Sequence, residues 1–273
     1  MSSAPHAASI GIDFGTSNTV VAVAAGDGRV ETIRFEHGGI AQSVYASALC
    51  FWQEHRGAGL PPRAEGGPWA IDRFLDGSEP LRFIQSLKTF AASESFQSTT
   101  IFQQRFRFED LLAAFLRTLT RHAGTGLDLA ASRVIIGRPV RFSGSNPDDA
   151  LAMQRYRDAF GRLGVHSPRY VYEPVGAAFS FARKLDRDAT VLVADFGGGT
   201  SDFSIMRFWK SDGALRAEPL GHAGIGIAGD TFDARIVDRV VAPRLGKGGS
   251  YRSFGNVLPA PAHYFVLSLI HIS

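Results

Sequence analysis

Short apolar segments separated by glycine-rich polar turns open the chain. The segment IGIDF at residues 10–14 is followed by the turn GTSN and by a second apolar segment, TVVAVAA, at residues 19–25. A Gly-Asp-Gly turn then leads to VETIRF at residues 30–35. Apolar runs of this length bounded by such turns are typical of strands. We therefore predict an antiparallel meander at the start of the chain.

Helical spacing appears further along the chain. Apolar residues recur at Phe108, Leu111, Leu112, Phe115, Leu116 and Leu119. This spacing predicts an amphipathic helix packed on a sheet. A buried strand, RVIIG, is expected from Arg133, and a second helix is expected to begin with Asn146 as its N-cap and to end at Gly164.

The rest of the pattern alternates strand and helix. We expect a strand at residues 169–173, a helix opened by Pro174 and a strand at residues 190–195. Residues 55–67 are rich in Gly, Pro, Arg and Glu, which predicts an exposed loop without chemistry. The fold class is therefore α/β.

One sequence pattern occurs twice in the chain. IGIDFGTSNTVVAV from residue 10 and LVADFGGGTSDFSIM from residue 192 each consist of an apolar strand, Asp-Phe-Gly, a small-residue turn and a second strand. A repeated unit of this kind indicates two lobes with the same core. We place the lobes at residues 1–186 and 187–273.

The repeated units carry the candidate chemistry. Each first strand ends in an aspartate, Asp13 or Asp195, followed by small residues that let backbone N–H groups approach an anion. These small residues are Gly15, Thr16, Ser17, Gly197, Gly198, Gly199 and Thr200. Carboxylates facing each other across a cleft suit Mg²⁺ held largely through its waters. A plain hairpin turn is the alternative for either unit alone, but the pair favours a nucleotide site.

Composition excludes several other classes. With 273 residues, 45% of them hydrophobic, the chain can bury a sizeable core, and a net charge of +3 without long basic runs argues against a nucleic-acid partner. The single cysteine, Cys50, fits a reducing cytoplasm. Residues 1–9 do not read as a secretory signal, and no apolar run is long enough to span a membrane. No Walker-type loop is present, and the glycines of residues 221–229 lack the order of a dinucleotide fingerprint.

Four motifs follow one another between residues 10 and 238: IGIDFGTSNTVVAV, YVYEPVGAAFSFA, VLVADFGGGTSDFSIM and GIAGDTFDARIVD. In this order they resemble the motifs of the DnaK-type heat-shock protein 70 family, and within it the YegD-like branch, which is thought to lack the peptide-binding domain. The resemblance implies an actin-like ATPase fold with ribonuclease H-like repeated lobes. It also implies ATP or ADP with Mg²⁺ as the ligand, and client proteins or co-chaperones as partners.

The resemblance also implies roles for single residues. Asp13 and Asp195 would organise the Mg²⁺ shell, and Glu173 would help to position metal-bound water. Pro139 would link nucleotide state to lobe position, and Lys88 would orient the attacking water, with a solvated lysine as the alternative reading. The small residues of both turns would hold phosphates, and the turn that reaches toward the nucleotide from the second lobe would contain Gly229 and Asp230.

The resemblance further implies that the family's adenosine motif would follow the segment that ends near Pro243. We therefore expect a complete first lobe, a truncated second lobe and weak ATP binding, and we have no assignment for the final residues, YFVLSLIHIS. The leading function is an ATP-hydrolysing switch of the chaperone type. An actin-like filament protein, a sugar or acetate kinase, and a nucleotide-binding module that does not hydrolyse remain open.

Overall fold

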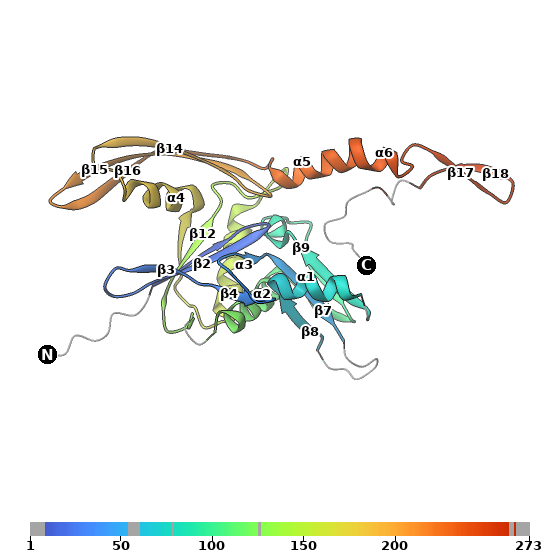
Figure 1. Ribbon diagram of the computed structural model, residues 1–273, viewed down its shortest axis with the longest axis horizontal. Helices are drawn as coiled ribbons and strands as arrows, with labels where there is room; N and C mark the ends of the chain where they lie inside the picture. The colour runs from blue at the N-terminus through green and yellow to red at the C-terminus, as the bar shows by residue number, and fades with distance from the viewer. Residues whose placement is uncertain (1–8, 54–60, 78, 125–126, 262–264, 266–273) are drawn as a thin grey trace.

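Hydrogen-bonded strand pairs divide the main strands of the chain between two sheets (Figure 1). The computed structural model describes residues 9–53, 61–77, 79–124 and 127–261, together with residue 265. The first sheet has the order β13-β12-β1-β2-β3, and β6 also pairs with β2. The second sheet has the order β14-β15-β16.

The first sheet begins with the predicted meander. Its strands are β1 (Ser9–Phe14), β2 (Asn18–Ala24), β3 (Val30–Thr32), β6 (Tyr45–Ala46), β12 (Arg133–Arg138) and β13 (Arg169–Tyr172). The strands β1, β2 and β3 are antiparallel neighbours, whereas β12 is parallel to both β1 and β13. This confirms the meander and places the carboxyl ends of β1, β12 and β13 at one edge of the sheet.

The second sheet repeats the opening hairpin. Its strands are β14 (Ala189–Phe196), β15 (Ser201–Ser211) and β16 (Ala214–Ile225). In the first hairpin Asp13 lies opposite Val20, whereas in the second hairpin Asp195 lies opposite Asp202. The two hairpins therefore share a backbone form but differ in the side chain that faces the aspartate.

Helices cover both sheets. Helix α2 (Phe108–Ala123) is amphipathic as predicted, and it packs with α3 (Asp149–Gly161) against the first sheet. The rings of Phe14 and Phe115 lie 5.5 Å apart in this core. Helix α4 (Glu173–Ala182) packs instead on the second sheet, where Ala178 and Ala182 contact the cluster of Met206 and Phe208.

The ends of α3 show how local chemistry sets its limits. The predicted N-cap, Asn146, is wrong, because Asp148 is the cap and its carboxylate accepts the Leu151 N–H at 2.9 Å. That bond satisfies a backbone donor of the first turn, which Asn146 lies too early to reach. The helix ends at Gly161 with Arg162 as its C-cap, earlier than the predicted end at Gly164. Gly164 lies in the turn that follows, with φ +81°, and the N–H of Val165 binds the carbonyl of Phe160 at 3.1 Å.

The segment between the meander and α2 holds several short strands and a helix, and part of it belongs to the main core. It contains β4 (Phe35–His37), β5 (Ile40–Gln42), β7 (Ala48–Trp52), β8 (Arg63–Gly66), α1 (Gly67–Asp76), β9 (Leu81–Gln85), the 3₁₀ turn η1 (Leu87–Phe90), β10 (Thr99–Ile101) and β11 (Gln104–Phe106). The exposed loop predicted for residues 55–67 is wrong over its described end, because residues 63–66 pair with the buried strand β7. Residues 54–60 lie outside the described part of the chain.

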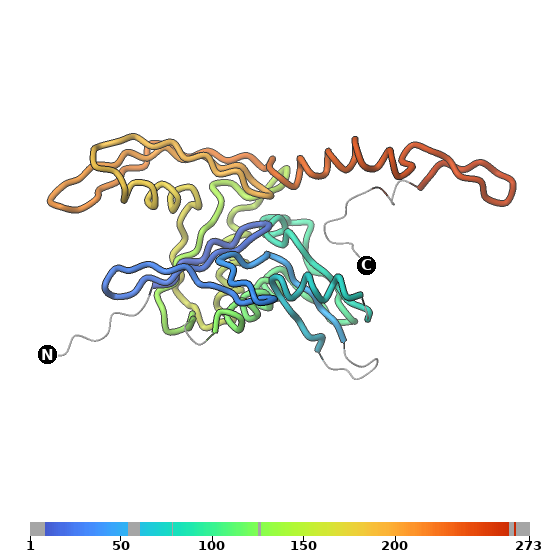
Figure 2. The backbone as a smooth tube through the Cα atoms, viewed as in Figure 1, coloured from blue at the N-terminus to red at the C-terminus, as the bar shows by residue number. Residues whose placement is uncertain are grey.

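The chain continues beyond the second sheet through helical turns and a hairpin (Figure 2). These are α5 (Gly229–Ile236), the π-helical turn η2 (Val237–Val241), α6 (Ala242–Arg244), β17 (Ser250–Ser253) and β18 (Asn256–Pro259). Residues 1–8 and nearly all of YFVLSLIHIS lie outside the described residues, so the expectations for them are not addressed. Within the described segments, no helix has the length and apolar character needed to cross a membrane.

Candidate functional site

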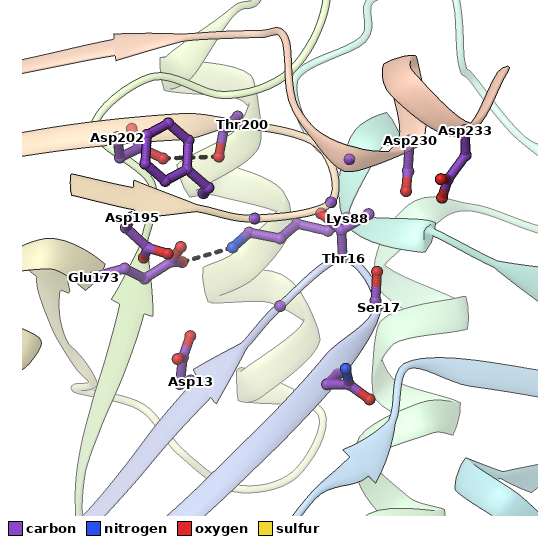
Figure 3. Close-up of a pocket in the computed structure, with 16 residues that line it drawn as sticks. Asp13, Thr16, Ser17, Lys88, Glu173, Asp195, Thr200, Asp202, Asp230 and Asp233 are labelled. Carbon is purple, nitrogen blue, oxygen red and sulfur yellow. Dashed lines mark hydrogen bonds and ion pairs between the residues drawn. The ribbon is translucent and has the colours of Figure 1, made fainter. Parts of the chain in front are cut away.

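The turns of the two repeated hairpins meet at one cavity of about 380 Å³ (Figure 3). Its size falls in the range of roughly 300–1,000 Å³ typical of small-molecule sites. The predicted residues that line it are Asp13, Gly15, Thr16, Ser17, Lys88, Glu173, Asp195, Gly197, Gly198, Thr200, Gly229 and Asp230. Residues far apart in the sequence are therefore brought together as the repeat predicted.

The two turns have the same backbone geometry. The N–H of Gly15 binds the carbonyl of Asn18 at 3.0 Å, and the N–H of Gly197 binds the carbonyl of Thr200 at 2.9 Å. The glycines of these turns do not have positive φ, so their backbone conformation does not require glycine. A Cβ at Gly198 would lie 2.8 Å from Ser17 Oγ. Close approach of the two turns therefore leaves no room for a side chain at position 198.

Gly199 is the exception among the predicted phosphate-binding residues. It does not line the cavity, and the position of its missing Cβ faces residues that precede the second sheet in the chain. A Cβ there would lie 2.6 Å from Ser143 Oγ and 3.0 Å from Thr16 Oγ1. The structure thus assigns Gly199 to the contact between the two sheet regions.

Lys88 and Glu173 form a buried ion pair on one wall of the cavity. Lys88 comes from the turn η1 and Glu173 from the start of α4, and Lys88 Nζ lies 2.6 Å from Glu173 Oε1. Their side chains are 6% and 9% exposed. These values exclude the reading of Lys88 as a solvated surface lysine.

Several lining residues were missed by the sequence analysis: Asn18, Phe196, Asp202 and Asp233. The signal for Asp202 was its place on the return strand, in register with Asp195. Asp233 follows Asp230 by three positions on α5, so both side chains reach the same side of the helix. Pro139, which has a predicted role, does not line the cavity but lies in the segment after β12.

Comparison with known proteins shows the family of this chain. The family model described as "Hsp70 protein" matches residues 85–247, which is more than half of the chain. The chain belongs to the Hsp70 family. An actin-like ATPase fold follows from this membership, and the mixed α/β architecture agrees with it.

Curated Hsp70-family relatives are similar over most of the chain. The chaperone protein dnaK3 of Thermosynechococcus vestitus is 29% identical over 88% of this chain and 35% of its own length. The chaperone protein dnaK of Gracilaria tenuistipitata var. liui is 28% identical over 85% of this chain and 37% of its own length. A chaperone protein HscA homolog of Tolumonas auensis is 28% identical over 87% and 38%. The chain thus spans little more than a third of the length of these relatives.

Charge in the cavity of this Hsp70-family chain is strongly unbalanced. The acidic lining residues are Asp13, Glu173, Asp195, Asp202, Asp230 and Asp233. Among the described residues that line the cavity, Lys88 is the only basic one. Because like charges repel at short range, bound cations would favour the entry of a polyphosphate into this cavity.

The donor set suits a hydrated magnesium ion. In the described part of the chain, no group of three His, Cys, Asp or Glu side chains could hold a metal ion directly. Mg²⁺ keeps several of its waters and usually binds one or two carboxylates together with substrate phosphates. Asp13 and Asp195 border the same cavity, and Oδ2 of Asp230 is buried there without a hydrogen-bond partner. The residues present therefore fit Mg²⁺ together with a phosphate ligand.

Two carboxyl groups at the site have raised pKa values. Burial raises the pKa of Glu173 to about 7, although the neighbouring Lys88 ammonium lowers it, and the charge of Asp13 adds to the rise. Burial, followed by the charges of Asp13 and Asp202, also raises the pKa of Asp195. Shifted pKa values of this kind are common among the residues of functional sites.

The raised pKa of Glu173 predicts a pH-dependent stability. A carboxyl whose pKa is higher in the folded state stabilises the fold fully below the unfolded pKa of 4.5, and this contribution is lost as the pH rises through about 7. One such group changes the free energy of unfolding by at most about 1.4 kcal/mol per pH unit. We expect E173Q to flatten this dependence in urea unfolding between these two pH values. The exposed carboxyl variant E218Q is the control, and a slope in E173Q equal to that of the parent chain contradicts the prediction.

Proposed function

We propose that this chain binds ATP or ADP with Mg²⁺ in the cavity between the two hairpin turns, and that it acts as an ATP-hydrolysing switch of the DnaK type. The observation that carries the proposal is the convergence of Asp13 and Asp195 on one cavity with the buried pair of Lys88 and Glu173. Residues 1–186 and 187–273 are proposed as its two lobes.

Each group of residues has a task in this proposal. Backbone N–H groups of the turns that contain Thr16 and Gly198 bind phosphate oxygens, since glycine removes the obstruction of a Cβ. The Lys88 ammonium orients the attacking water, and Glu173 holds that ammonium in place through their ion pair. Bound Mg²⁺ would supply charge neutralisation of the phosphates. Catalysis rests on positioning and charge, with no covalent enzyme intermediate.

The wider biological setting is part of the proposal. The relatives are chaperones, which supports client proteins or co-chaperones as partners. Cys50 is buried and free, which suits a reducing cytoplasm.

Calorimetric titration with ATP and ADP tests the proposal. We expect binding in the presence of Mg²⁺ and its loss when EDTA removes the metal, because the acidic lining repels free polyphosphate. Nucleotide binding of equal strength with and without Mg²⁺, or no binding at all, would reject it.

Three further measurements separate the alternatives. Phosphate release without added sugar distinguishes the switch from a sugar or acetate kinase, which requires an acceptor. Sedimentation with ATP distinguishes it from an actin-like filament protein. Binding without any phosphate release would identify a module that no longer hydrolyses.

A further inference from the structure

A short segment of the first-sheet region lies against the second sheet. We name residues 139–144 the strap; it follows β12 and precedes α3. Oδ1 of Asp202, on β15, accepts the backbone N–H groups of Val140 at 2.9 Å and of Arg141 at 3.3 Å. Because Asp202 is only 1% exposed, these bonds between the two regions are shielded from water.

Glycines on the second sheet make room for the strap. A Cβ at Gly224 would lie 2.5 Å from Asp202 Oδ1 and 3.0 Å from the backbone nitrogen of Arg141. A Cβ at Gly226 would lie 3.4 Å from the nitrogen of Gly144. The end of β16 therefore approaches the strap backbone more closely than a side chain at position 224 would allow.

The other side of the strap is held by Arg138. Its guanidinium donates to the carbonyls of Pro139 at 3.0 Å and Val140 at 3.4 Å, and to Asp149 Oδ2 at 2.9 Å. The strap is thus fixed to the first-sheet region through its carbonyls and to the second sheet through its N–H groups.

The strap begins beside the predicted catalytic groups. A Cβ at Gly137 would lie 3.1 Å from Glu173 Cγ and 3.4 Å from Asp13 Oδ1, so β12 ends between these two side chains. At the other end of the contact, Asp202 lies opposite Asp195 in the β14–β15 register. A shift of the strap relative to β16 would therefore change how the two predicted magnesium-binding aspartates face each other.

We propose that Asp202 and Gly224 are positioning residues, which hold the strap against β16 and thereby fix the relative position of Asp13 and Asp195. The first hairpin supports this reading, because it has Val20 where the second has Asp202, so the acid is not needed for the hairpin itself. The proposal rests on the nucleotide-binding function proposed above. It adds that the affinity for nucleotide depends on the contact of the strap with Asp202 and Gly224, although the strap itself does not line the cavity.

Two alanine variants on the same strand provide the test. G224A places a methyl group against the strap, whereas at Gly221 nothing lies within 4 Å of an added Cβ, so G221A is the matched control. Spin labels at cysteines introduced at the exposed positions Glu31 and Lys210 report the distance between the sheets, while Cys50 is buried. Without nucleotide, we expect a longer and broader distance distribution in G224A and an unchanged one in G221A.

Nucleotide affinity gives the second readout. Because the added methyl group overpacks the contact with the strap, we expect the Kd for Mg-ADP to rise roughly tenfold in G224A and to stay unchanged in G221A. G224A with the distances and Kd of G221A would overturn the strap proposal. If the parent chain binds no nucleotide, the proposed function fails, and the label distances still decide the role of the strap.

A second pair of variants covers the case in which G224A does not fold. D202N keeps a carbonyl oxygen that can accept both strap N–H groups, whereas D202A leaves them without a partner. We expect D202N to retain the label distances of the parent chain and D202A to lose them. Equal distances in the parent chain and D202A would also overturn the proposal.

Discussion

Replacement of Lys88 by methionine is expected to destabilise the fold by about 3 kcal/mol at pH 8, because it leaves the Glu173 carboxylate buried without its partner. At pH 6 the loss should be smaller, because burial raises the pKa of Glu173 and the lowering effect of the Lys88 ammonium on this pKa is lost in K88M, so that the carboxyl takes up a proton more readily. Urea unfolding at both pH values measures this difference.

Two further variants show whether charge or packing causes the loss of stability in K88M. K88M/E173Q should recover most of the lost stability, because no uncompensated charge remains in the buried pair. K184M removes an exposed lysine and should leave the unfolding free energy unchanged. A double variant as unstable as K88M alone would show that packing, rather than charge, explains the loss.

The same substitution should nearly abolish ATP hydrolysis. Removal of one preorganised group that stabilises transition-state charge typically lowers kcat about 10²–10³-fold. We expect a loss of that order in K88M, in a single-turnover assay, with Mg-ADP binding reduced much less. A hydrolysis rate equal to that of K184M would contradict the role proposed for Lys88.

Replacement of Asp195 by asparagine is expected to weaken the response to magnesium. If Asp195 holds Mg²⁺ through its waters, its loss should raise the Mg²⁺ concentration for half-maximal nucleotide binding about 10–100-fold, as for other groups that orient a metal shell. Titration of Mg²⁺ at fixed ATP measures the shift, and D13N should behave in the same way.

A matched surface variant controls for the change in charge. Asp212 is exposed in the β15–β16 hairpin with φ 52°, a conformation that asparagine also adopts readily. D212N therefore removes one negative charge from the same sheet without straining the turn. A magnesium response in D195N no different from that in D212N would remove Asp195 from the proposed site.

Sequence reasoning located this site because its strongest signal is local. The apolar strand, the aspartate and the glycine turn lie within one short segment, and the segment occurs twice. The apolar runs and their turns predicted the meander at the start of the chain, and the repeat predicted the residues that the two turns bring together. Helix α2 was predicted for the same reason, since its apolar face can be read from spacing alone.

The features that the sequence did not reveal depend on distant partners. Lys88 and Glu173 lie 85 positions apart, and only the packing of η1 beside α4 makes them a buried pair. Strand β8 forms in a glycine- and proline-rich segment because β7 offers it a pairing edge. The hydrogen bonds of Asp202 to the strap also come from a distant part of the chain, since the donors are the backbone N–H groups of Val140 and Arg141.

The excess of carboxylates around the cavity also links ligand occupancy to the melting temperature. Six acidic groups face one ammonium there, so their mutual repulsion opposes folding of the free chain. A ligand that binds only the native state shifts the unfolding equilibrium by RT ln(1 + [L]/Kd). The melting temperature of an Hsp70-family chain with this lining should therefore rise with the concentrations of nucleotide and divalent cation. The heat resistance of the protein would then depend on how much of these ligands is present.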